Sequence, residues 1–271
     1  MSEPTGDEVR LTAIEADACW ELLGLGDTPL TLALPSPGRT PVERRALLTA
    51  VRNALHDRGL SDDHGPGEQI ARSLRLLAGP DHHIDLILVG EPYRHIVAIG
   101  AVRRDSAVVA YRRGDLVRLV PVRRGSVVAH LMTTVGPLRP GPGRPVNVPT
   151  EVFDAAAAAA STGTGTGTGG SLWVMADELI ARGVPRADAT SWVHMCTGIR
   201  AVGQFGTALW PEGRHRLGPW VIGFHATASG HFLQLRRPDP GGHGATVTVC
   251  PLSGRRLASL VAELVECGQG T

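Results

Sequence analysis

The strongest constraint on the fold is an order of predicted elements that occurs twice in this 271-residue chain. In each half a helix ends at a glycine, within Asp57-Arg58-Gly59-Leu60 and within Ala181-Arg182-Gly183-Val184. A second helix and four short strands follow in both halves. The fourth strand then reaches a proline, Pro121 or Pro251, and a further helix begins. Because one order of elements is repeated, we expect a molecule with a quasi-two-fold axis.

Short turns separate the predicted strands, and connections of this length favour antiparallel neighbours. We therefore expect an α+β fold in which the two meanders join into one central antiparallel sheet, flanked by two helical bundles. One further strand is predicted at Leu30–Leu34, where apolar and small residues alternate up to Pro35. The main strands are expected at residues 84–89, 95–102, 107–111 and 116–120, and again at 199–209, 220–226, 231–236 and 245–249.

Two capping boxes mark helix starts in the first half. Thr12 is followed by Glu15, and Thr40 by Pro41 and Glu43, so each Thr and Glu pair can satisfy free N–H groups reciprocally. The remaining helices follow from apolar spacing and from the glycines that end each run. They are expected at residues 68–78, 124–135, 172–182, 187–196 and 254–266.

The composition also indicates where the two halves divide. Residues 137–149 are rich in proline and glycine, which is typical of a linker. The first half then comprises residues 1–136 and the second half residues 150–271, fused into one globular domain. A Gly/Thr repeat at residues 161–171 is a low-complexity tract, and we expect it to form a disordered loop.

All 27 basic residues are arginine, against 26 acidic residues. Without lysine the chain cannot form a Schiff base with a substrate or with pyridoxal phosphate, and it cannot build a P-loop. The four cysteines are scattered without a CxxC pair, which is typical of a reduced protein without a structural zinc site. We recognise no signal peptide and no apolar run of membrane-spanning length, so we expect a cytoplasmic protein.

No catalytic motif can be assembled from local spacing. HExxH and GxSxG are absent, and no nucleophile lies near a base and an orienting group. His225 and His231 could face each other across a hairpin, but a metal ion would need a third ligand. We therefore expect no enzyme, no metal and no cofactor. A small-molecule enzyme whose active site is built from distant residues remains the alternative.

Arginine is concentrated in the strands of the first half. Residues 94–124 contain eight arginines and two aspartates, a local charge of 8 − 2 = +6. Such a segment can bind an acidic protein surface or a phosphate backbone, or it can keep strand edges soluble. The overall charge of +1 argues against a general nucleic-acid binder, which is kept as an alternative. The candidate contact residues in this segment are Arg103, Arg104, Arg112 and Arg113.

Aromatic residues are concentrated in the second half. Eight of the 11 follow residue 150, and five lie between Phe205 and Phe232. Such side chains dominate both sheet cores and protein interfaces. Strand alternation would place Ile222 on one face of the sheet and Val221 on the other, so that one face can be core and the other a docking surface. The candidates for partner binding here are Phe205, Trp210, Trp220, Phe224, His225 and His231.

Several short segments form an ordered set along the chain. They are Leu11-Thr12 with Glu15 and Ala16, Trp20-Glu21-Leu22-Leu23-Gly24, Pro35, Thr40 with Glu43-Arg44, Leu55-x-x-Arg58-Gly59-Leu60, Gln204-Phe205-Gly206, and the hairpin from Phe224 to Leu233. This set resembles the EspG family of type VII (ESX) secretion-associated proteins over nearly the whole chain. The hairpin departs from the family, because His231 stands where arginine is usual and Ala226 where an acidic residue is common.

The resemblance implies a quasi-symmetric α/β chaperone or adaptor in the cytosol rather than an enzyme. It would hold the tip of a helical secretion substrate, such as the PPE partner of a PE–PPE-like pair or another helical ESX substrate. Binding would keep an apolar helix tip soluble and direct the substrate to its own secretion system. Neither membrane nor nucleic acid is an expected partner on this interpretation.

Overall fold

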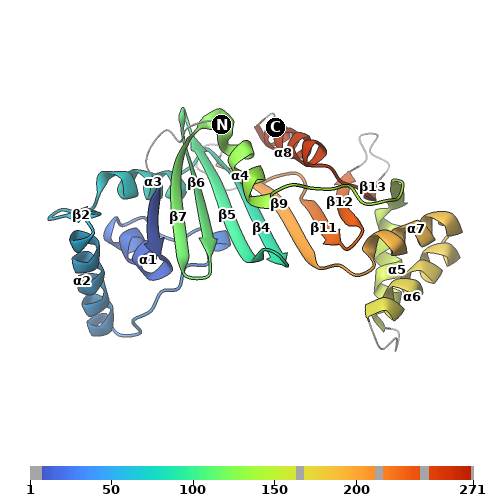
Figure 1. The fold of residues 1–271 in the computed structure, drawn as a ribbon, viewed down its shortest axis with the longest axis horizontal. Coiled ribbons are helices and arrows are strands. Elements are labelled where there is room, and N and C mark those ends of the chain that lie inside the picture. The colour runs from blue at the N-terminus through green and yellow to red at the C-terminus, as the bar shows by residue number, and fades with distance from the viewer. Residues whose placement is uncertain (1–7, 163–167, 211–215, 239–243, 270–271) are drawn as a thin grey trace.

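Eleven strands form one antiparallel sheet that runs through the molecule (Figure 1). The computed structural model describes residues 8–162, 168–210, 216–238 and 244–269. The strand order is β1-β7-β6-β5-β4-β9-β11-β12-β13-β8, and β10 pairs with β9. The strands are β1 (Val9–Thr12), β4 (His82–Gly90), β5 (Arg94–Arg103), β6 (Ser106–Arg113), β7 (Leu116–Arg123), β8 (Val146–Pro149), β9 (Ala201–Leu209), β10 (Arg216–Leu217), β11 (Ile222–Thr227), β12 (Gly230–Pro238) and β13 (Ala245–Pro251); a separate hairpin pairs β2 (Ser61–Asp62) with β3 (Gly65–Pro66).

The strand order is the same from the centre outward in both directions. β4 and β9 lie side by side at the centre, with Leu86 opposite Phe205. β5, β6, β7 and β1 follow on one side, and β11, β12, β13 and β8 on the other. The prediction of one antiparallel sheet built from two meanders is therefore confirmed. The boundaries of the two halves stay a prediction, although residues 137–149 are more than a linker because they contain β8.

Both predicted capping boxes are formed. Glu15 N–H donates to Thr12 Oγ1 at 3.1 Å, and Thr12 N–H donates to Glu15 Oε2 at 2.7 Å. Thr40 and Glu43 make the same reciprocal pair at 3.2 and 3.1 Å.

No helix of the described ranges is both long enough and apolar enough to cross a bilayer. The helices are α1 (Ala13–Leu22), α2 (Pro41–Asp57), α3 (Glu68–Ala78), α4 (Val127–Val135), α5 (Thr150–Thr162), α6 (Thr168–Ala181), α7 (Arg186–Cys196) and α8 (Gly254–Gln269), with short 3-10 turns η1 (Leu30–Leu32) and η2 (Arg124–Ser126).

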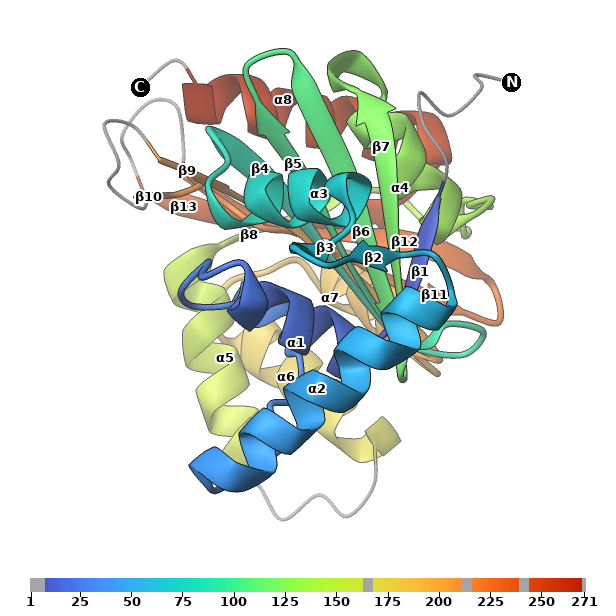
Figure 2. The same ribbon diagram turned by 90° about the vertical axis from the view of Figure 1, so that its left-hand side faces the viewer.

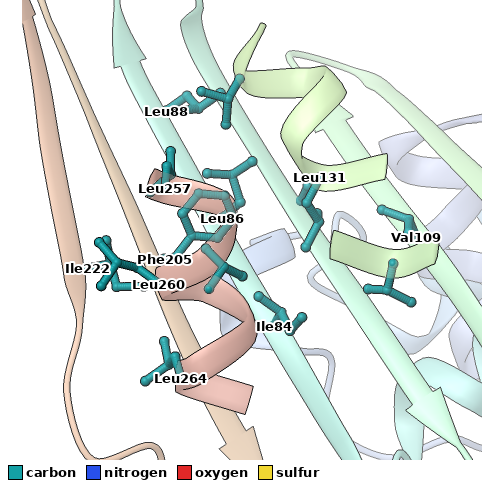
Figure 3. Packing of buried hydrophobic residues seen from close by; sticks show 14 of the residues in the cluster. Ile84, Leu86, Leu88, Val109, Leu131, Phe205, Ile222, Leu257, Leu260 and Leu264 are labelled. Atoms are coloured by element: carbon teal, nitrogen blue, oxygen red, sulfur yellow. The ribbon is translucent and has the colours of Figure 1, made fainter. Parts of the chain in front are cut away.

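Helices α4 and α8 pack together over the centre of one face of the sheet (Figure 3). Leu86 of β4 and Phe205 of β9 are fully buried beneath them. Leu131 of α4 and Leu260 of α8 belong to the same cluster and are also fully buried. This core contains side chains from both meanders, so it joins the two halves into one hydrophobic layer.

The opposite face of the sheet carries helices near its two ends (Figures 1 and 2). At one end α1 and α3 pack on the strands β5, β6 and β7, and α2 packs on α1; Leu55, Leu74 and Leu119 are buried there. At the other end α5 and α7 pack on β8 and β13, and α6 packs on α5 and α7; Trp192 and Phe232 are buried there. The two expected helical bundles are therefore present, and the central strands lie between them.

Three local predictions differ from the structure. Leu30–Leu34 is not a strand, because Leu30–Leu32 forms η1, which ends at Ala33 with a left-handed φ of 45°. β1 and β8 were not predicted, because strands of four residues at a sheet edge leave only a short alternating pattern. The expected disordered loop at 161–171 is helical on both flanks, in α5 and α6, while its residues 163–167 lie outside the described residues.

Candidate partner-binding surface

The centre of the second face carries apolar side chains that the described helices leave exposed. We call this surface the open strip; it consists of the apolar Val89 of β4, Val202 of β9 and Val221 just before β11, together with the half-buried Ile87 of β4 and the polar Gln204 of β9. Val89, Val202 and Val221 are 41%, 46% and 44% exposed. A single exposed valine needs no explanation, but neighbouring apolar side chains on central strands are typical of an interaction surface.

Strand alternation explains why these side chains share one face. The even-numbered residues in 84–88 of β4 are buried under α4 and α8, so the odd-numbered residues point to the opposite face. The register places Val89 opposite Val202 and Ile87 opposite Gln204 across the β4–β9 pair. Cross-strand neighbours at this spacing form one continuous surface.

Two glycines add accessible backbone to the open strip. Gly206 of β9 and Gly223 of β11 follow the same alternation as Gln204. Apart from the chain neighbours of Gly206, no described heavy atom lies within 4 Å of the position that its Cβ would take. A partner can therefore approach the sheet more closely here than side chains would allow.

A polar cluster borders the open strip near the start of β4. His83 Nε2 lies 2.9 Å from Asp85 Oδ2, and Thr31 Oγ1 donates to Asp85 Oδ1 at 2.8 Å. The Trp210 ring stands edge-on to the His83 ring, with 4.9 Å between their centroids. These groups are partly exposed, so they can form a polar rim beside an apolar contact.

The turn η1 brings a further apolar side chain to this border. Leu30 is 95% exposed, whereas Leu32 is buried. Arg112 holds the turn, because its Nη1 donates to Leu32 O at 2.7 Å and also to Ala33 O. The adjacent Thr31 is bonded to the polar cluster. Leu30 therefore projects into solvent beside the open strip.

Helix α7 borders the open strip on the other side. His225 of β11 points to the face of the strip but is only 2% exposed. Its Nε2 lies 2.9 Å from Met195 O of α7, and its ring stacks on Phe232. Burial lowers the pKa of His225, and the hydrogen bond to Met195 O acts in the opposite sense. His225 is therefore part of the contact between α7 and the sheet.

The predicted aromatic candidates lie mainly in the core. Phe205 and Phe224 stack with 6.2 Å between ring centroids and are 0% and 4% exposed. Trp220 is half-buried against the same core, and the guanidinium carbon of Arg237 lies 4.5 Å from its ring centroid. These residues shape the sheet but leave little side-chain surface for a partner. Trp210, in contrast, stands at the border of the open strip.

His231 is held by the chain itself. Arg139 N–H donates to His231 Nδ1 at 3.0 Å, and His231 N–H donates to Arg139 O at 2.8 Å. The register pairs His225 with Phe232 and His231 with Ala226, so the two histidines do not face each other. Within the described ranges no group of three or more His, Cys, Asp or Glu side chains could hold a metal ion.

The predicted arginine candidates fall at opposite ends of β6. Arg103 and Arg104 are exposed around the β5–β6 turn. Arg112 and Arg113 lie at the far end of β6, where Arg112 is engaged with η1. The structure therefore does not bring the ten candidate residues together on one surface, and their part in partner binding stays a prediction.

A comparison with known proteins decides the family. The sequence model of the EspG family matches residues 12–263. The chain belongs to the EspG family. Its fold is similar to that of the Mycobacterium tuberculosis type VII secretion system chaperone EspG5, solved in complex with a PE25–PPE41 dimer: the two chains are 15% identical, the TM-score is 0.74, and 96% of each is covered. The expected EspG-like architecture is thus confirmed; no curated protein sequence matches.

Most of the open strip of this EspG-family chain was missed by sequence reasoning. Only Val221 was placed on the face opposite Ile222, and the structure confirms that placement. The run Ile84–Val89 is apolar at nearly every position, which hides the residues that face solvent. In β9 the signal was present, because Val202 and Gln204 alternate with buried positions.

Proposed function

We propose that this EspG-family protein is a cytoplasmic secretion chaperone whose open strip binds the helical tip of a PE–PPE-like pair. It is a binding protein and not an enzyme on this proposal. The EspG5 chaperone, which shares the fold, was solved with a PE25–PPE41 dimer, and this similarity supports the choice of partner. A chaperone of this kind keeps an apolar end of its substrate out of water until the substrate is exported.

The observation that carries the proposal is the open strip between two helix bundles. Its exposed valines offer apolar area in the middle of the sheet, and the glycines beside them let a helix end approach the backbone. The tip of a helical pair exposes both apolar side chains and unpaired backbone groups. The strip and its polar border at His83 and Asp85 match both requirements, since one contributes apolar contact and the other hydrogen bonds.

The arginine-rich segment gives less support to nucleic-acid binding. Arg112 is bound to carbonyl oxygens of η1, and Arg118 is bound to Glu8. Arg103 and Arg104 lie at the other end of β6 from Arg112. A phosphate backbone is bound by a long continuous basic face, and Arg112 and Arg118, which are engaged within the chain, do not extend one along β6 and β7.

The decisive experiment is co-expression with PE–PPE-like pairs encoded at the same locus. A tag on the PPE-like chain allows capture, and light scattering during size-exclusion chromatography gives the stoichiometry. We expect a soluble 1:1:1 complex, and we expect the PPE-like chain to be less soluble when this chaperone is omitted. If the folded chain co-purifies with no such pair, the proposal is wrong.

A further inference from the structure

A hollow in the N-terminal half lies between α3 and the adjoining ends of β6 and β7. Its volume is about 560 Å³, and a second hollow of about 350 Å³ adjoins it. Apolar side chains form the floor, namely Leu76 of α3 and the cross-strand neighbours Val108 and Pro121 of the sheet. None of these residues belongs to the open strip. The hollow is therefore a separate surface with its own apolar base.

Arginines surround this hollow. Arg72, Arg123 and Arg124 line the larger part, and Arg75, Arg103 and Arg104 line the smaller one beside Arg72. The acidic residues lining the two parts are Glu68 and Asp105, so the lining charge is 6 − 2 = +4. Glu68 and Arg72 form an exposed ion pair with 3.3 Å between their charged atoms. An apolar base within a positive rim matches an anionic chain that also carries apolar groups.

The quasi-two-fold repeat shows what occupies the corresponding place in the C-terminal half. There α7 takes the position of α3, and β12 and β13 take those of β6 and β7. The chain's own extended segment Arg139–Arg144 fills that place. Gly141 N–H donates to His231 O at 3.2 Å, and Arg144 forms an ion pair with Asp188 of α7.

The filling segment is closely packed. A Cβ on Gly141 would lie 2.1 Å from the Phe232 ring, and one on Gly143 would lie 3.1 Å from Met195 Sδ. The segment is rich in proline and glycine, and two arginines flank it. The C-terminal half thus shows that an extended Pro-rich peptide fits between this helix and these strands. In the N-terminal half the corresponding place is hollow and basic.

We propose that the hollow beside α3 binds an extended, acidic, proline-containing peptide segment of a partner protein. Carboxylates of the peptide pair with the arginines of the rim, and its proline rings lie on the apolar base. Arginine suits this role because its planar guanidinium binds carboxylates through two parallel hydrogen bonds. The site is independent of the open strip, so a chain that fails to bind a PE–PPE-like pair can still bind this peptide.

The test uses the full chain and a fluorescein-labelled decapeptide of alternating glutamate and proline, with a glutamine–proline decapeptide as uncharged control. Fluorescence anisotropy gives Kd at several salt concentrations. We expect binding to the acidic peptide that weakens with salt, and no binding to the control peptide. The double variant Arg72→Gln/Arg123→Gln should raise Kd about tenfold. Both side chains are exposed, and thermal unfolding verifies that the variant is folded.

A matched variant removes the same charge elsewhere. Arg255→Gln/Arg256→Gln lies on exposed positions of α8, and we expect its Kd to stay within twofold of the original. If both double variants weakened peptide binding equally, the binding would be a nonspecific effect of net charge, and the proposal would be wrong. Tighter binding by Glu3→Gln/Asp7→Asn would overturn it too, because the chain's own first residues would then be the occupant. Stronger binding of a single-stranded oligothymidine than of the peptide would assign the hollow to nucleic acid instead.

Discussion

Val89 of β4 lies directly opposite Val202 of β9 at the seam between the two meanders, and both side chains remain more than two-fifths exposed. The seam is the centre of the sheet, where side chains are normally covered by another layer. On the other face the same strands are fully covered by α4 and α8. On the function proposed above, the partner supplies the layer that is missing over this pair.

Val202→Asp tests this surface directly. The substitution places a carboxylate in the middle of an apolar contact, where it would be desolvated on binding. We expect the affinity for a PE–PPE-like pair to fall by a factor of about 10 to 100, as for a residue near the centre of an interface. Because Val202 is 46% exposed, the free energy of unfolding should change by less than about 1 kcal/mol. Surface plasmon resonance and urea unfolding measure the two effects.

Val42→Asp is the matched control for that substitution. Val42 is 68% exposed on α2 and lies outside the open strip. The same change of side chain should therefore leave partner affinity within about twofold. Loss of binding in the Val42 variant, with binding preserved in the Val202 variant, would place the partner on the helices instead of the sheet.

Phe205→Ala separates a core role from a contact role. Phe205 is fully buried, stacks on Phe224 and lies opposite Leu86, so truncation leaves a cavity. We expect a loss of about 3–5 kcal/mol in the free energy of unfolding, measured with urea. At a temperature where the variant is still folded, its partner affinity should stay near that of the original chain. A large loss of affinity for the partner, without a loss in the free energy of unfolding, would instead show that Phe205 contacts the partner.

The fold was largely predictable because its signals are local and repeated. The capping boxes at Thr12 and Thr40 can each be predicted from four neighbouring residues. The meanders can be predicted from short turns between apolar runs. β1 was missed because its four residues are too few to show a strand pattern of their own. They form a strand only because they pair with β7, which is distant in the sequence. The turn η1 was missed because the bonds to its carbonyls come from Arg112, far along the chain.

The binding surface was harder to predict, because burial depends on layers that are distant in sequence. Phe224 and His225 are adjacent, and alternation correctly sends them to opposite faces. Nothing local shows that α8 covers the first and α7 covers the second. The prediction based on aromatic residues therefore identified residues of the core. The smaller side chains of Val89 and Val202 are exposed because no helix covers them.

Arg112→Ala tests the anchoring of η1. The side chain donates to Leu32 O and Ala33 O, and its Nε donates to Gly114 O at 3.1 Å. Removing a charged donor from these carbonyls should cost about 1–3 kcal/mol in the free energy of unfolding. Arg113→Ala is the control, because that side chain is exposed and should change stability by less than about 0.5 kcal/mol. Equal effects in the two variants would contradict an anchoring role.

His225 should make stability depend on pH. Burial lowers its pKa in the folded state below the ordinary value of 6.5, so below about pH 6.5 the unfolded chain binds a proton that the folded chain does not. Acid therefore favours unfolding, by at most about 1.4 kcal/mol per pH unit for this group. His225→Asn should reduce the fall in the free energy of unfolding between pH 7.5 and pH 5.5, measured with urea at each pH.

A second histidine provides the comparison for that measurement. Burial also lowers the pKa of His82, with the charge of Arg124 acting in the same direction. His225→Asn alone should therefore leave part of the pH dependence, and the double variant with His82→Asn should remove more of it. An unchanged difference between the two pH values in the His225 variant would show that this ring is protonated in the folded protein. Its buried Nδ1, which has no hydrogen-bond partner among the described residues, makes such protonation unfavourable.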